Sequence, residues 1–376
     1  MTGEQLDTID DRVLSGLRRW PDVEAPNLHA VDASDRLILD EAAAALAESG
    51  PGEVVVIGDA YGALTIGAAA IGATGIRVFQ DSIMGERALA ANAAGAVDYV
   101  SLPLGADLVR GARVVLMQLP RSLAELDELA AWIASAADPA VRVYAGGRIK
   151  HMTTAMNEVL ARHFGRVDVT YARQKSRVLI ASQPLPSEPP MIAREFHTDL
   201  GIWVCATGAT FAGTRIDIGT RALLAVLPTV APDATTAADL GCGSGVVAAV
   251  LAQARPELAV LASDVSAGAV ASARATAEAN ALTNVTVTRD DALGGQPDAS
   301  LDLVVLNPPF HLGATVHTGA ASKLFAAAAR VLKQGGELVT VYNSHLGYRA
   351  ELTRVVGPTD ELSRTSKFTV TRSRKN

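Results

Sequence analysis

Short apolar runs rich in β-branched residues alternate with longer alanine-rich segments along most of the chain. In the second half this pattern predicts six strands, with helices between the early ones. The strands are Ala237–Leu240, Val260–Ser263, Val285–Thr288, Leu303–Leu306, Glu337–Tyr342 and Phe368–Thr371, and the helices lie around Val246–Ala254, Ala267–Asn280 and Ala320–Leu332. Apolar strands joined by helical crossovers are typical of a parallel sheet with both faces covered. We therefore predict an α/β fold, with an antiparallel edge where no helix separates the last two strands.

A proline-rich stretch divides this pattern into two halves. Residues 182–191 read SQPLPSEPPM. Proline lacks a backbone donor and disfavours helix in the residue before it, so the stretch is predicted to be an extended linker. We expect two domains, residues 1–190 and 191–376. This division suits a chain of 376 residues, because a domain commonly holds about 100–200 residues.

The two halves also resemble each other. The segment VVVIGDAYG (54–62) can be laid over AADLGCGSG (237–245), so that the first and last glycines of the two loops coincide. Further along, VVLMQLP (114–120) can be laid over VVLNPPF (304–310). A repeat of this kind predicts a duplicated domain.

The two copies differ mainly at polar positions. On this alignment Asn307 is replaced by Met117 in the first half, whereas Asp81 stands in the place of Asp264. We therefore expect the first copy to keep the scaffold and to lose the polar chemistry.

The glycine loop in the second copy is a candidate cofactor site. It reads DLGCGSG (239–245) and lies between a predicted strand and a predicted helix. Glycine lets the backbone turn sharply and approach a ligand closely, and ligands of open α/β sheets bind at the carboxyl ends of the strands. The spacing is G-x-G-x-G rather than the G-x-G-x-x-G of dinucleotide folds, which disfavours a nicotinamide-dependent oxidoreductase. A tight structural turn is the alternative interpretation.

Acidic residues follow the next two predicted strands. Asp264 can accept hydrogen bonds from both hydroxyls of a ribose, or it can cap the following helix. Asp290 and Asp291 end the third strand, where a carboxylate can accept a hydrogen bond from an adenine amino group, or face solvent in a turn. Gly219 and Thr220 either line the same pocket or cap a helix.

The sequence Asn307-Pro308-Pro309-Phe310 after the fourth strand is the most specific signal. An amino nitrogen conjugated to a ring is a poor nucleophile, because its lone pair is delocalised. The side-chain oxygen of Asn307 and the carbonyl of Pro308 can accept its two N–H bonds and aim the lone pair. The prolines hold that carbonyl rigidly, and Phe310 offers a face for stacking a base. The chemistry predicted is methylation of an amino group, in which the protein chiefly supplies positioning.

Composition narrows the class of protein. Hydrophobic residues make up 49% and charged residues 19% of the chain, as in globular proteins. The two cysteines fit a reducing cytoplasm, and the N-terminal residues 1–11 lack the apolar run of a secretory signal. The apolar stretch 60–76 is short and interrupted by glycines, so we expect a buried helix rather than a membrane span. The histidines show no metal-ligand spacing, and no metal is predicted.

These motifs resemble the class I S-adenosylmethionine-dependent methyltransferases. More narrowly, the chain is similar to the bacterial ribosomal RNA guanine-N2 methyltransferases, both type C, which modifies small-subunit RNA, and type G, which modifies large-subunit RNA. The resemblance covers most of the chain. It rests on DLGCGSG (239–245), SDVS (263–266), NPPFH (307–311), KQGGEL (333–338), NSHLGYRAEL (343–352), SKFTV (366–370) and, in the first half, GDAYGALT (58–65).

The resemblance implies two tandem Rossmann-like methyltransferase domains, of which the first is degenerate and only the second binds S-adenosylmethionine. It implies a cytoplasmic enzyme that methylates the N2 amino group of a guanine in ribosomal RNA, free or in a ribosomal subunit. The residues from Asn307 to Phe310 would hold the guanine amino group. The methionine part of the cofactor would contact Asp239, Gly241, Gly243 and Gly245, the ribose Asp264 and the adenine Asp291.

Other partners remain open at this point. The net charge of −7 is unusual for an RNA enzyme, since phosphate contacts dominate RNA affinity. Amino-methylation of a protein glutamine or of adenine is one alternative, and a non-catalytic RNA-binding assembly factor is another.

As a hypothesis, clustered basic residues contact RNA phosphates, the alternative being ordinary solvated charge. They are Arg142, Arg148, Lys150, His151, Arg173, Lys175 and Arg177, with Arg364, Lys367, Arg372, Arg374 and Lys375 near the end of the chain.

Overall fold

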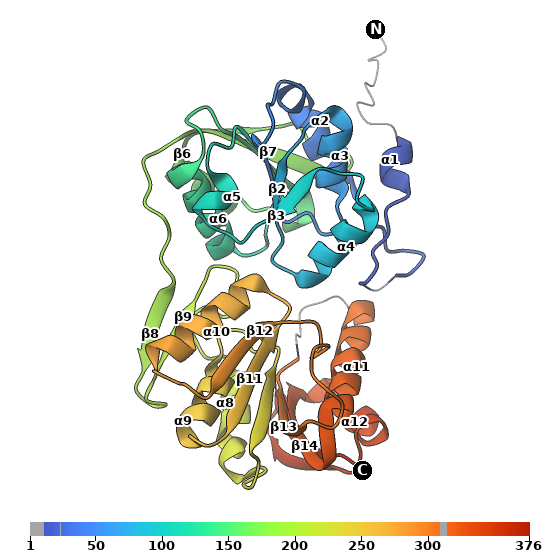
Figure 1. The fold of residues 1–376 in the computed structure, drawn as a ribbon, viewed down its shortest axis with the longest axis vertical. Coiled ribbons are helices and arrows are strands. Elements are labelled where there is room, and N and C mark those ends of the chain that lie inside the picture. The colour runs from blue at the N-terminus through green and yellow to red at the C-terminus, as the bar shows by residue number, and fades with distance from the viewer. Residues whose placement is uncertain (1–10, 23, 309–313) are drawn as a thin grey trace. The chain divides into compact units, whose positions relative to one another are not determined.

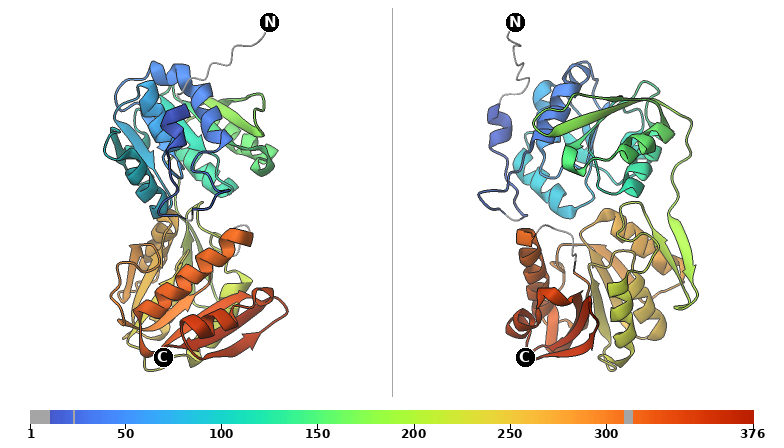
Figure 2. Two further views of the ribbon diagram at one scale, coloured as in Figure 1. Left: turned by 90° about the vertical axis from the view of Figure 1, so that its right-hand side faces the viewer. Right: turned by 180° about the vertical axis from the view of Figure 1, so that it is seen from behind.

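The computed structural model describes residues 11–22, 24–308 and 314–376. The chain divides into two compact units, residues 1–191 and 192–376. Each unit is built around a seven-stranded sheet flanked by helices (Figures 1 and 2).

The first unit holds a mostly parallel sheet in the order β3-β2-β1-β4-β5-β7-β6, in which β7 runs antiparallel to both of its neighbours. Its strands are β1 (Val54–Ile57), β2 (Ile76–Phe79), β3 (Tyr99–Ser101), β4 (Val114–Gln118), β5 (Arg142–Arg148), β6 (Phe164–Val169) and β7 (Ser176–Pro184). Its helices are α1 (Asp11–Ser15), α2 (Ala33–Ala47), α3 (Ala63–Ile71), α4 (Ile83–Ala93), α5 (Ala106–Val109), α6 (Leu123–Ala136) and α7 (Thr154–His163), with the 3-10 turn η1 (Ile149–His151).

The second unit begins with a separate two-stranded sheet and continues into a sheet of order β12-β11-β10-β13-β14-β16-β15. Its strands are β8 (Ala193–His197), β9 (Ile202–Ala206), β10 (Thr236–Leu240), β11 (Ala259–Asp264), β12 (Val285–Arg289), β13 (Leu301–Leu306), β14 (Leu332–Asn343), β15 (Thr359–Arg364) and β16 (Phe368–Arg374). Its helical elements are α8 (Ile218–Val226), η2 (Leu227–Thr229), α9 (Val246–Ala254), α10 (Ala267–Ala279), α11 (Ala314–Val331), η3 (Ser344–Leu346) and α12 (Arg349–Val355).

The two large sheets have the same strand order when each is numbered from its own first strand. In both, five parallel strands are followed by an antiparallel pair at one edge. The predicted doubly wound fold and its tandem repeat are therefore confirmed, as is the antiparallel edge between β14 and β16. The sequence pattern did not predict α8, α12, β8, β9 or β15, which are short elements of five to nine residues each.

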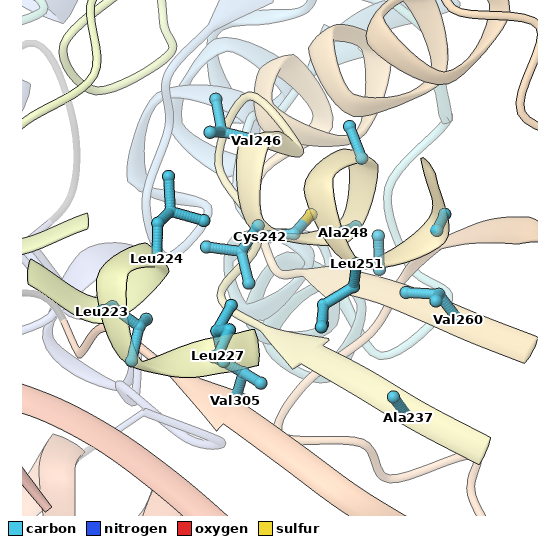
Figure 3. Close-up of a cluster of buried hydrophobic side chains, with 14 of the residues drawn as sticks. Leu223, Leu224, Leu227, Ala237, Cys242, Val246, Ala248, Leu251, Val260 and Val305 are labelled. Atoms are coloured by element: carbon cyan, nitrogen blue, oxygen red, sulfur yellow. The ribbon is translucent and has the colours of Figure 1, made fainter. Parts of the chain in front are cut away.

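Alternate residues of the central strand β13 pack on opposite faces of the second large sheet. Leu303 and Val305 of β13 join a core with α8 and α9, whereas Val304 and Leu306 join a core with α11 and α12. Figure 3 shows the first of these cores, in which leucines of α8 and η2 meet valines of α9, β11 and β13. Both faces of the sheet are thus covered, which explains the continuous apolar runs in the sequence.

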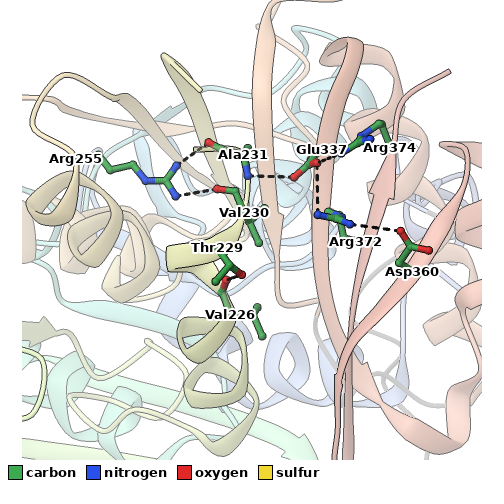
Figure 4. A network of polar contacts seen from close by, with 9 residues as sticks. All are labelled: Val226, Thr229, Val230, Ala231, Arg255, Glu337, Asp360, Arg372 and Arg374. Atoms are coloured by element: carbon green, nitrogen blue, oxygen red, sulfur yellow. Dashed lines mark hydrogen bonds and ion pairs between the residues drawn. The ribbon is translucent and has the colours of Figure 1, made fainter. Parts of the chain in front are cut away.

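Hydrogen bonds and ion pairs of Glu337 connect the antiparallel edge of the second sheet to its parallel part. Glu337 of β14 is buried and accepts hydrogen bonds from the main-chain N–H of Ala231, at 3.2 Å, and from Arg374 of β16, at 2.8 Å (Figure 4). Arg372 lies between Glu337 and Asp360. These arginines of the chain's last strand are therefore engaged inside the unit, which weakens the hypothesis that they contact RNA phosphates.

Among the described residues, no helix combines the length and the apolar character needed to cross a membrane. The stretch 60–76 instead contains α3, whose first six residues are buried in the first unit.

Candidate cofactor and substrate site

The glycine loop of the second unit connects β10 to α9. Gly241, Gly243 and Gly245 all have positive φ angles, of 74°, 53° and 77°, which side chains other than glycine adopt at a cost. A Cβ at Gly245 would lie 2.9 Å from Ala273 of α10, so that glycine allows two helices to pack closely. A Cβ at Gly241 or Gly243 would meet no atom within 4 Å, so the loop backbone there is open to a ligand.

Asp239 lies in β10, immediately before this loop. Its Oδ2 accepts a hydrogen bond from the main-chain N–H of Ala248 at 3.0 Å, which satisfies a free donor in the first turn of α9. The side chain is 3% exposed, and burial raises its pKa to about 7. Its predicted contact with the methionine part of the cofactor stays a prediction.

Asp264 is the last residue of β11, and its carboxylate connects the glycine loop to the start of α10. Its Oδ2 accepts a hydrogen bond from the N–H of Gly243, and its Oδ1 accepts one from the N–H of Ser266, both at 3.0 Å. Ser266, not Asp264, is the N-cap of α10. The N-cap interpretation of Asp264 was therefore wrong. The half-buried carboxylate lies beside the open glycine loop, as its predicted ribose contact requires.

The two aspartates after β12 have different surroundings. Asp290 accepts hydrogen bonds from the N–H groups of Asp291 and Gly295, at 2.8 Å each, and so shapes the turn. Asp291 forms an ion pair with Lys323 of α11, with 2.6 Å between Nζ and Oδ2. A role in adenine binding stays a prediction for Asp291, and no pattern along the chain had pointed to its lysine partner.

Asn307 follows β13 at the same edge of the sheet. Its Nδ2 donates a hydrogen bond to Thr220 Oγ1 of α8 at 3.0 Å. Its Oδ1 is buried and has no hydrogen-bond partner among the residues that the structure describes. Pro308 is buried beside it. The predicted site residues Pro309 and Phe310 lie outside the described residues.

These groups come together because of the sheet topology. Parallel strands bring their carboxyl ends to one edge, and β10, β11 and β13 are parallel neighbours there. The glycine loop, Asp264 and Asn307 therefore line a single edge, with Asp291 after the next parallel strand, β12. The site suits a nucleoside cofactor with a charged amino-acid end, because the glycine backbone is open to close approach and the carboxylates can accept hydrogen bonds from hydroxyl and amino groups.

Some residues of the site were missed or left undecided by the sequence pattern. Asp217 caps α8 through the N–H groups of Gly219 and Thr220, and its Oδ2 accepts the hydroxyl hydrogen of Thr220 at 2.5 Å. Gly219 and Thr220 therefore do lie in a helix cap, while Thr220 also reaches Asn307. The signal for Asp217 in the sequence was an Asp at the start of the segment IGTRALLAV, because Asp is a favoured N-cap residue.

The first unit carries related groups at its own carboxyl edge, but in a different register from the predicted one. Ile57 pairs with Met117 in the first sheet, as Leu240 pairs with Leu306 in the second. The residue equivalent to Asn307 is therefore Gln118, and the predicted equivalence with Met117 was wrong. The alignment of the two sequences matched runs of apolar residues, whereas the pairing between strands shows which residues of the two units are equivalent.

The same shift applies at the second strand of each sheet. Ile57 pairs with Phe79, as Leu240 pairs with Ser263. Gln80, rather than Asp81, is thus the equivalent of Asp264. The expectation that the first copy loses its polar chemistry was therefore wrong at Gln118, where an amide is kept. At Gln80 an acceptor-only carboxylate has become an amide.

Polar groups of the first unit bond to one another around the equivalent loop. Asp59 is 1% exposed, and burial raises its pKa. It accepts hydrogen bonds from the N–H groups of Gly62, at 3.0 Å, and Thr65, at 2.8 Å, and Gln80 donates to its main-chain oxygen. Asp59 therefore ties down the start of α3, as Asp239 does for α9.

Comparisons with known proteins match both units. Residues 201–372 match the family described as the methyltransferase small domain, and residues 6–185 match the RLMG N-terminal domain. The chain is 35% identical to the ribosomal RNA large subunit methyltransferase G of Streptomyces avermitilis, over 96% of each chain. It is 36% identical to the protein of that name from Pseudomonas aeruginosa, over 96% of this chain and 97% of that one.

A solved structure shows the same fold. The 16S rRNA N2 methyltransferase of T. thermophilus, determined in complex with AdoMet and guanosine, is similar with a TM-score of 0.70. The match covers 90% of this chain and 92% of that one, at 20% sequence identity. Both units of the present chain thus have counterparts of known fold.

Proposed function

Since the chain belongs to the ribosomal RNA large subunit methyltransferase G family, and is an S-adenosylmethionine-dependent ribosomal RNA methyltransferase, we propose that it methylates the exocyclic N2 amino group of a guanine. The observation that carries this proposal is the buried, unpartnered Oδ1 of Asn307. A buried acceptor without a partner costs about 1–3 kcal/mol, so a donor supplied by the substrate would be strongly favoured.

The amino group of guanine has two N–H bonds and a delocalised lone pair. Asn307 Oδ1 accepts one N–H, and the main-chain carbonyl of Pro308 accepts the other. Holding both hydrogens lets the nitrogen become tetrahedral, which localises the lone pair on the side that faces the cofactor edge of the sheet. Positioning of this kind can contribute on the order of 7–11 kcal/mol.

S-adenosylmethionine, when bound, supplies a methyl group on a sulfonium, which is already an activated electrophile. The residues suited to hold it are the open glycines Gly241 and Gly243, with Asp264 for the ribose and Asp291 for the adenine. Gly245 and Asp239 support them by fixing the start of α9. The same arrangement would serve adenine or a protein glutamine, so the substrate must be identified by its product.

The first unit supplies a surface suited to RNA. Arg148, Lys150 and Lys175 lie where β5 and β7 meet at the carboxyl end of β5, since Arg148 pairs with Ser176 and the N–H of Ile149 donates to the carbonyl of Lys175. Desolvation lowers the pKa of His151, and the nearby charges of Arg121, Lys150 and Arg148 lower it further. We call Arg121, Arg148, Lys150 and Lys175 the basic cluster.

The basic cluster is not neutralised within its own unit. Across the described part of the chain, no acidic side chain lies within ion-pair distance of its four members. Arg173, by contrast, pairs with Asp40 and Glu41, and Arg142 lies at the opposite end of β5. We infer that the basic cluster contacts RNA phosphates, which a chain of net charge −7 needs on a local surface.

Nucleoside analysis of treated RNA tests the proposed function. The protein would be incubated with S-adenosylmethionine and with unmodified 16S or 23S transcripts or unmethylated ribosomal subunits, and the digested nucleosides measured by mass spectrometry. N2-methylguanosine is expected, and Asn307→Ala should reduce it at least 100-fold, on the order of the cost of a misplaced reacting group, without changing the melting temperature by more than a few degrees. Methyladenosine, or label in ribosomal protein, would overturn the guanine assignment.

A further inference from the structure

Three side chains link the start of α8 to the end of β13. Asp217 Oδ2 lies 2.5 Å from Thr220 Oγ1, and Thr220 Oγ1 lies 3.0 Å from Asn307 Nδ2. Asp217 is also the N-cap of α8, where its Oδ1 accepts from the N–H groups of Gly219 and Thr220. The carboxylate is therefore fixed in place by the helix backbone and not only by the threonine hydroxyl.

Proton counting gives this series of hydrogen bonds a direction. The carboxylate of Asp217 can only accept a hydrogen bond, so the hydroxyl hydrogen of Thr220 points to it. The lone pairs of Thr220 Oγ1 are then left to accept from a donor. Only the NH₂ end of the Asn307 carboxamide is a donor, and its oxygen must turn the other way.

We propose that Asp217 and Thr220 are positioning residues that orient the Asn307 carboxamide with its oxygen toward the substrate. The inference rests on the proposed function, because it assigns Oδ1 as the acceptor of the substrate amino group. A freely rotating carboxamide would present its NH₂ end to the substrate about as often as its oxygen. An NH₂ group facing an amino group offers donors to donors, and the lone pair of the substrate is not aimed.

The first unit has a capping aspartate and a carboxamide in the equivalent places, but the carboxamide has different neighbours. Asp32 caps α2 as Asp217 caps α8, and Asp35 stands three residues later, in the place of Thr220. Gln118, the equivalent of Asn307, donates to Asp35, and its carbonyl oxygen lies 3.2 Å from the hydroxyl of Ser34. Ser34 has one hydroxyl hydrogen, which Asp32 can also accept, but this hydroxyl lies within hydrogen-bond distance of the Gln118 oxygen. Among the described residues, the oxygen of Asn307 has no partner.

Substitutions of Thr220 separate orientation from helix capping. Thr220→Val keeps the shape and the backbone N–H that Asp217 caps, but removes the hydroxyl. We expect kcat for guanine methylation to fall on the order of 100-fold, with the dissociation constant for S-adenosylmethionine unchanged within about twofold. Thr220→Ser should restore most of kcat. Thr229→Val is the matched control and should leave kcat unchanged, since among the described residues the Thr229 hydroxyl bonds only to the carbonyl of Val226, at 2.9 Å.

A second measurement does not depend on activity. In protein labelled with ¹⁵N on asparagine side chains, the NH₂ signals of Asn307 are identified by their loss in Asn307→Asp. We expect slow hydrogen exchange of these protons in the wild type and in Thr220→Ser, and at least tenfold faster exchange in Thr220→Val. Faster exchange together with a reduced kcat supports the proposal.

Unchanged exchange in Thr220→Val, or a kcat that Thr220→Ser does not recover, would overturn the orienting role. If the wild type methylates no guanine while Thr220→Val still accelerates exchange, the orientation of Asn307 stands and the proposed substrate fails. The two failures are thereby distinguished.

Discussion

Asn307 and Gln118 occupy equivalent positions and show how the surroundings of one residue decide its chemistry. Gln118 is the last residue of β4, Asn307 directly follows β13, and each carboxamide contacts the first turn of a helix capped by an aspartate. Thr220 accepts from the NH₂ end of Asn307, whose oxygen has no partner in the described part of the chain. Asp35 accepts from the NH₂ end of Gln118, whose oxygen lies 3.2 Å from the Ser34 hydroxyl. The side chains beside the carboxamide, Thr220 in one unit and Ser34 with Asp35 in the other, therefore decide whether its oxygen is left for a substrate.

Asp264 provides a first prediction at this scale. Replacing it with Ala removes the acceptors for the N–H groups of Gly243 and Ser266 as well as the predicted ribose contact. Titration calorimetry should show one equivalent of S-adenosylmethionine bound by the wild type and an affinity lower by about 10–100-fold in Asp264→Ala, since hydrogen bonds to charged groups contribute about 1.5–3 kcal/mol. Asp233→Ala, at an exposed position of the same unit, should bind as the wild type does. Two equivalents would show that the first unit also binds the cofactor.

The buried acid Asp35 leads to a prediction about pH. Burial raises its pKa to about 7, against an ordinary value of about 4 in the unfolded chain. Between these values the folded chain holds a proton that the unfolded chain releases, so this contribution to stability is complete below pH 4 and is lost as pH rises through 7. Asp35→Asn should flatten that part of the pH dependence.

Thermal unfolding of wild type and variants from pH 4.5 to 8 would measure the effect. The melting temperature of Asp35→Asn relative to the wild type should rise with pH across this range. Asp107→Asn is the control, because the side chain of Asp107 is 89% exposed. A constant difference between Asp35→Asn and the wild type would mean that Asp35 is ionised when folded throughout.

At the scale of elements, the strand-to-helix turn after β10 combines two constraints. Gly241 and Gly243 keep an open backbone at the sheet edge, while Gly245 lets α9 and α10 approach. The parallel strands then carry the acidic residues and Asn307 to that same edge. Helix α8, one of the elements that the sequence pattern did not predict, contacts Asn307. The site is therefore assembled from the turn and from a helix that precedes the large sheet in the chain.

Gly245→Ala and Gly335→Ala form a matched pair at this scale. Both glycines have a φ of 77°, but a Cβ at Gly335 would meet no atom within 4 Å, whereas at Gly245 it would lie 2.9 Å from Ala273. The left-handed backbone alone costs about 1–2 kcal/mol. We expect a modest loss of melting temperature for Gly335→Ala, and a larger loss with weaker cofactor binding for Gly245→Ala. Equal losses would contradict the close packing of α9 on α10.

At the scale of the whole molecule, the chain is a tandem repeat whose two units have diverged. Both sheets keep the same strand order. In the first unit, Asp59 and Gln80 form hydrogen bonds within the loop that follows β1. Among the described residues, no acidic side chain pairs with the basic cluster. In the second unit, Glu337 and Asp360 engage the arginines of the last strand (Figure 4). The arginines of β16 in the second unit are therefore paired with acids, whereas the basic cluster of the first unit has no acidic partner in the described part of the chain.

Charge reversal in the basic cluster tests that division. Arg148→Glu with Lys150→Glu should weaken binding to ribosomal RNA, and should reduce the slope of log affinity against log salt concentration by about 0.7–0.9 for each phosphate that is no longer bound. S-adenosylmethionine binding should not change. Arg148→Glu alone should weaken binding in the same direction, and Arg142→Glu, at the other end of β5, is its control with an equal change of net charge. Equal effects of Arg142→Glu and Arg148→Glu on affinity would mean that only the total charge matters.

The sequence by itself determined the fold class, the repeat, the glycine loop and the residues that follow each strand, because strand and helix periodicities and glycine turns are local properties. The register between the two copies was decided by strand pairing, which is why Gln118 and Gln80, rather than Met117 and Asp81, match Asn307 and Asp264. Partners distant along the chain were likewise decided only by tertiary structure. Thr220 lies 87 residues before Asn307, and only the folded sheet brings its hydroxyl to the amide and leaves the amide oxygen for a substrate.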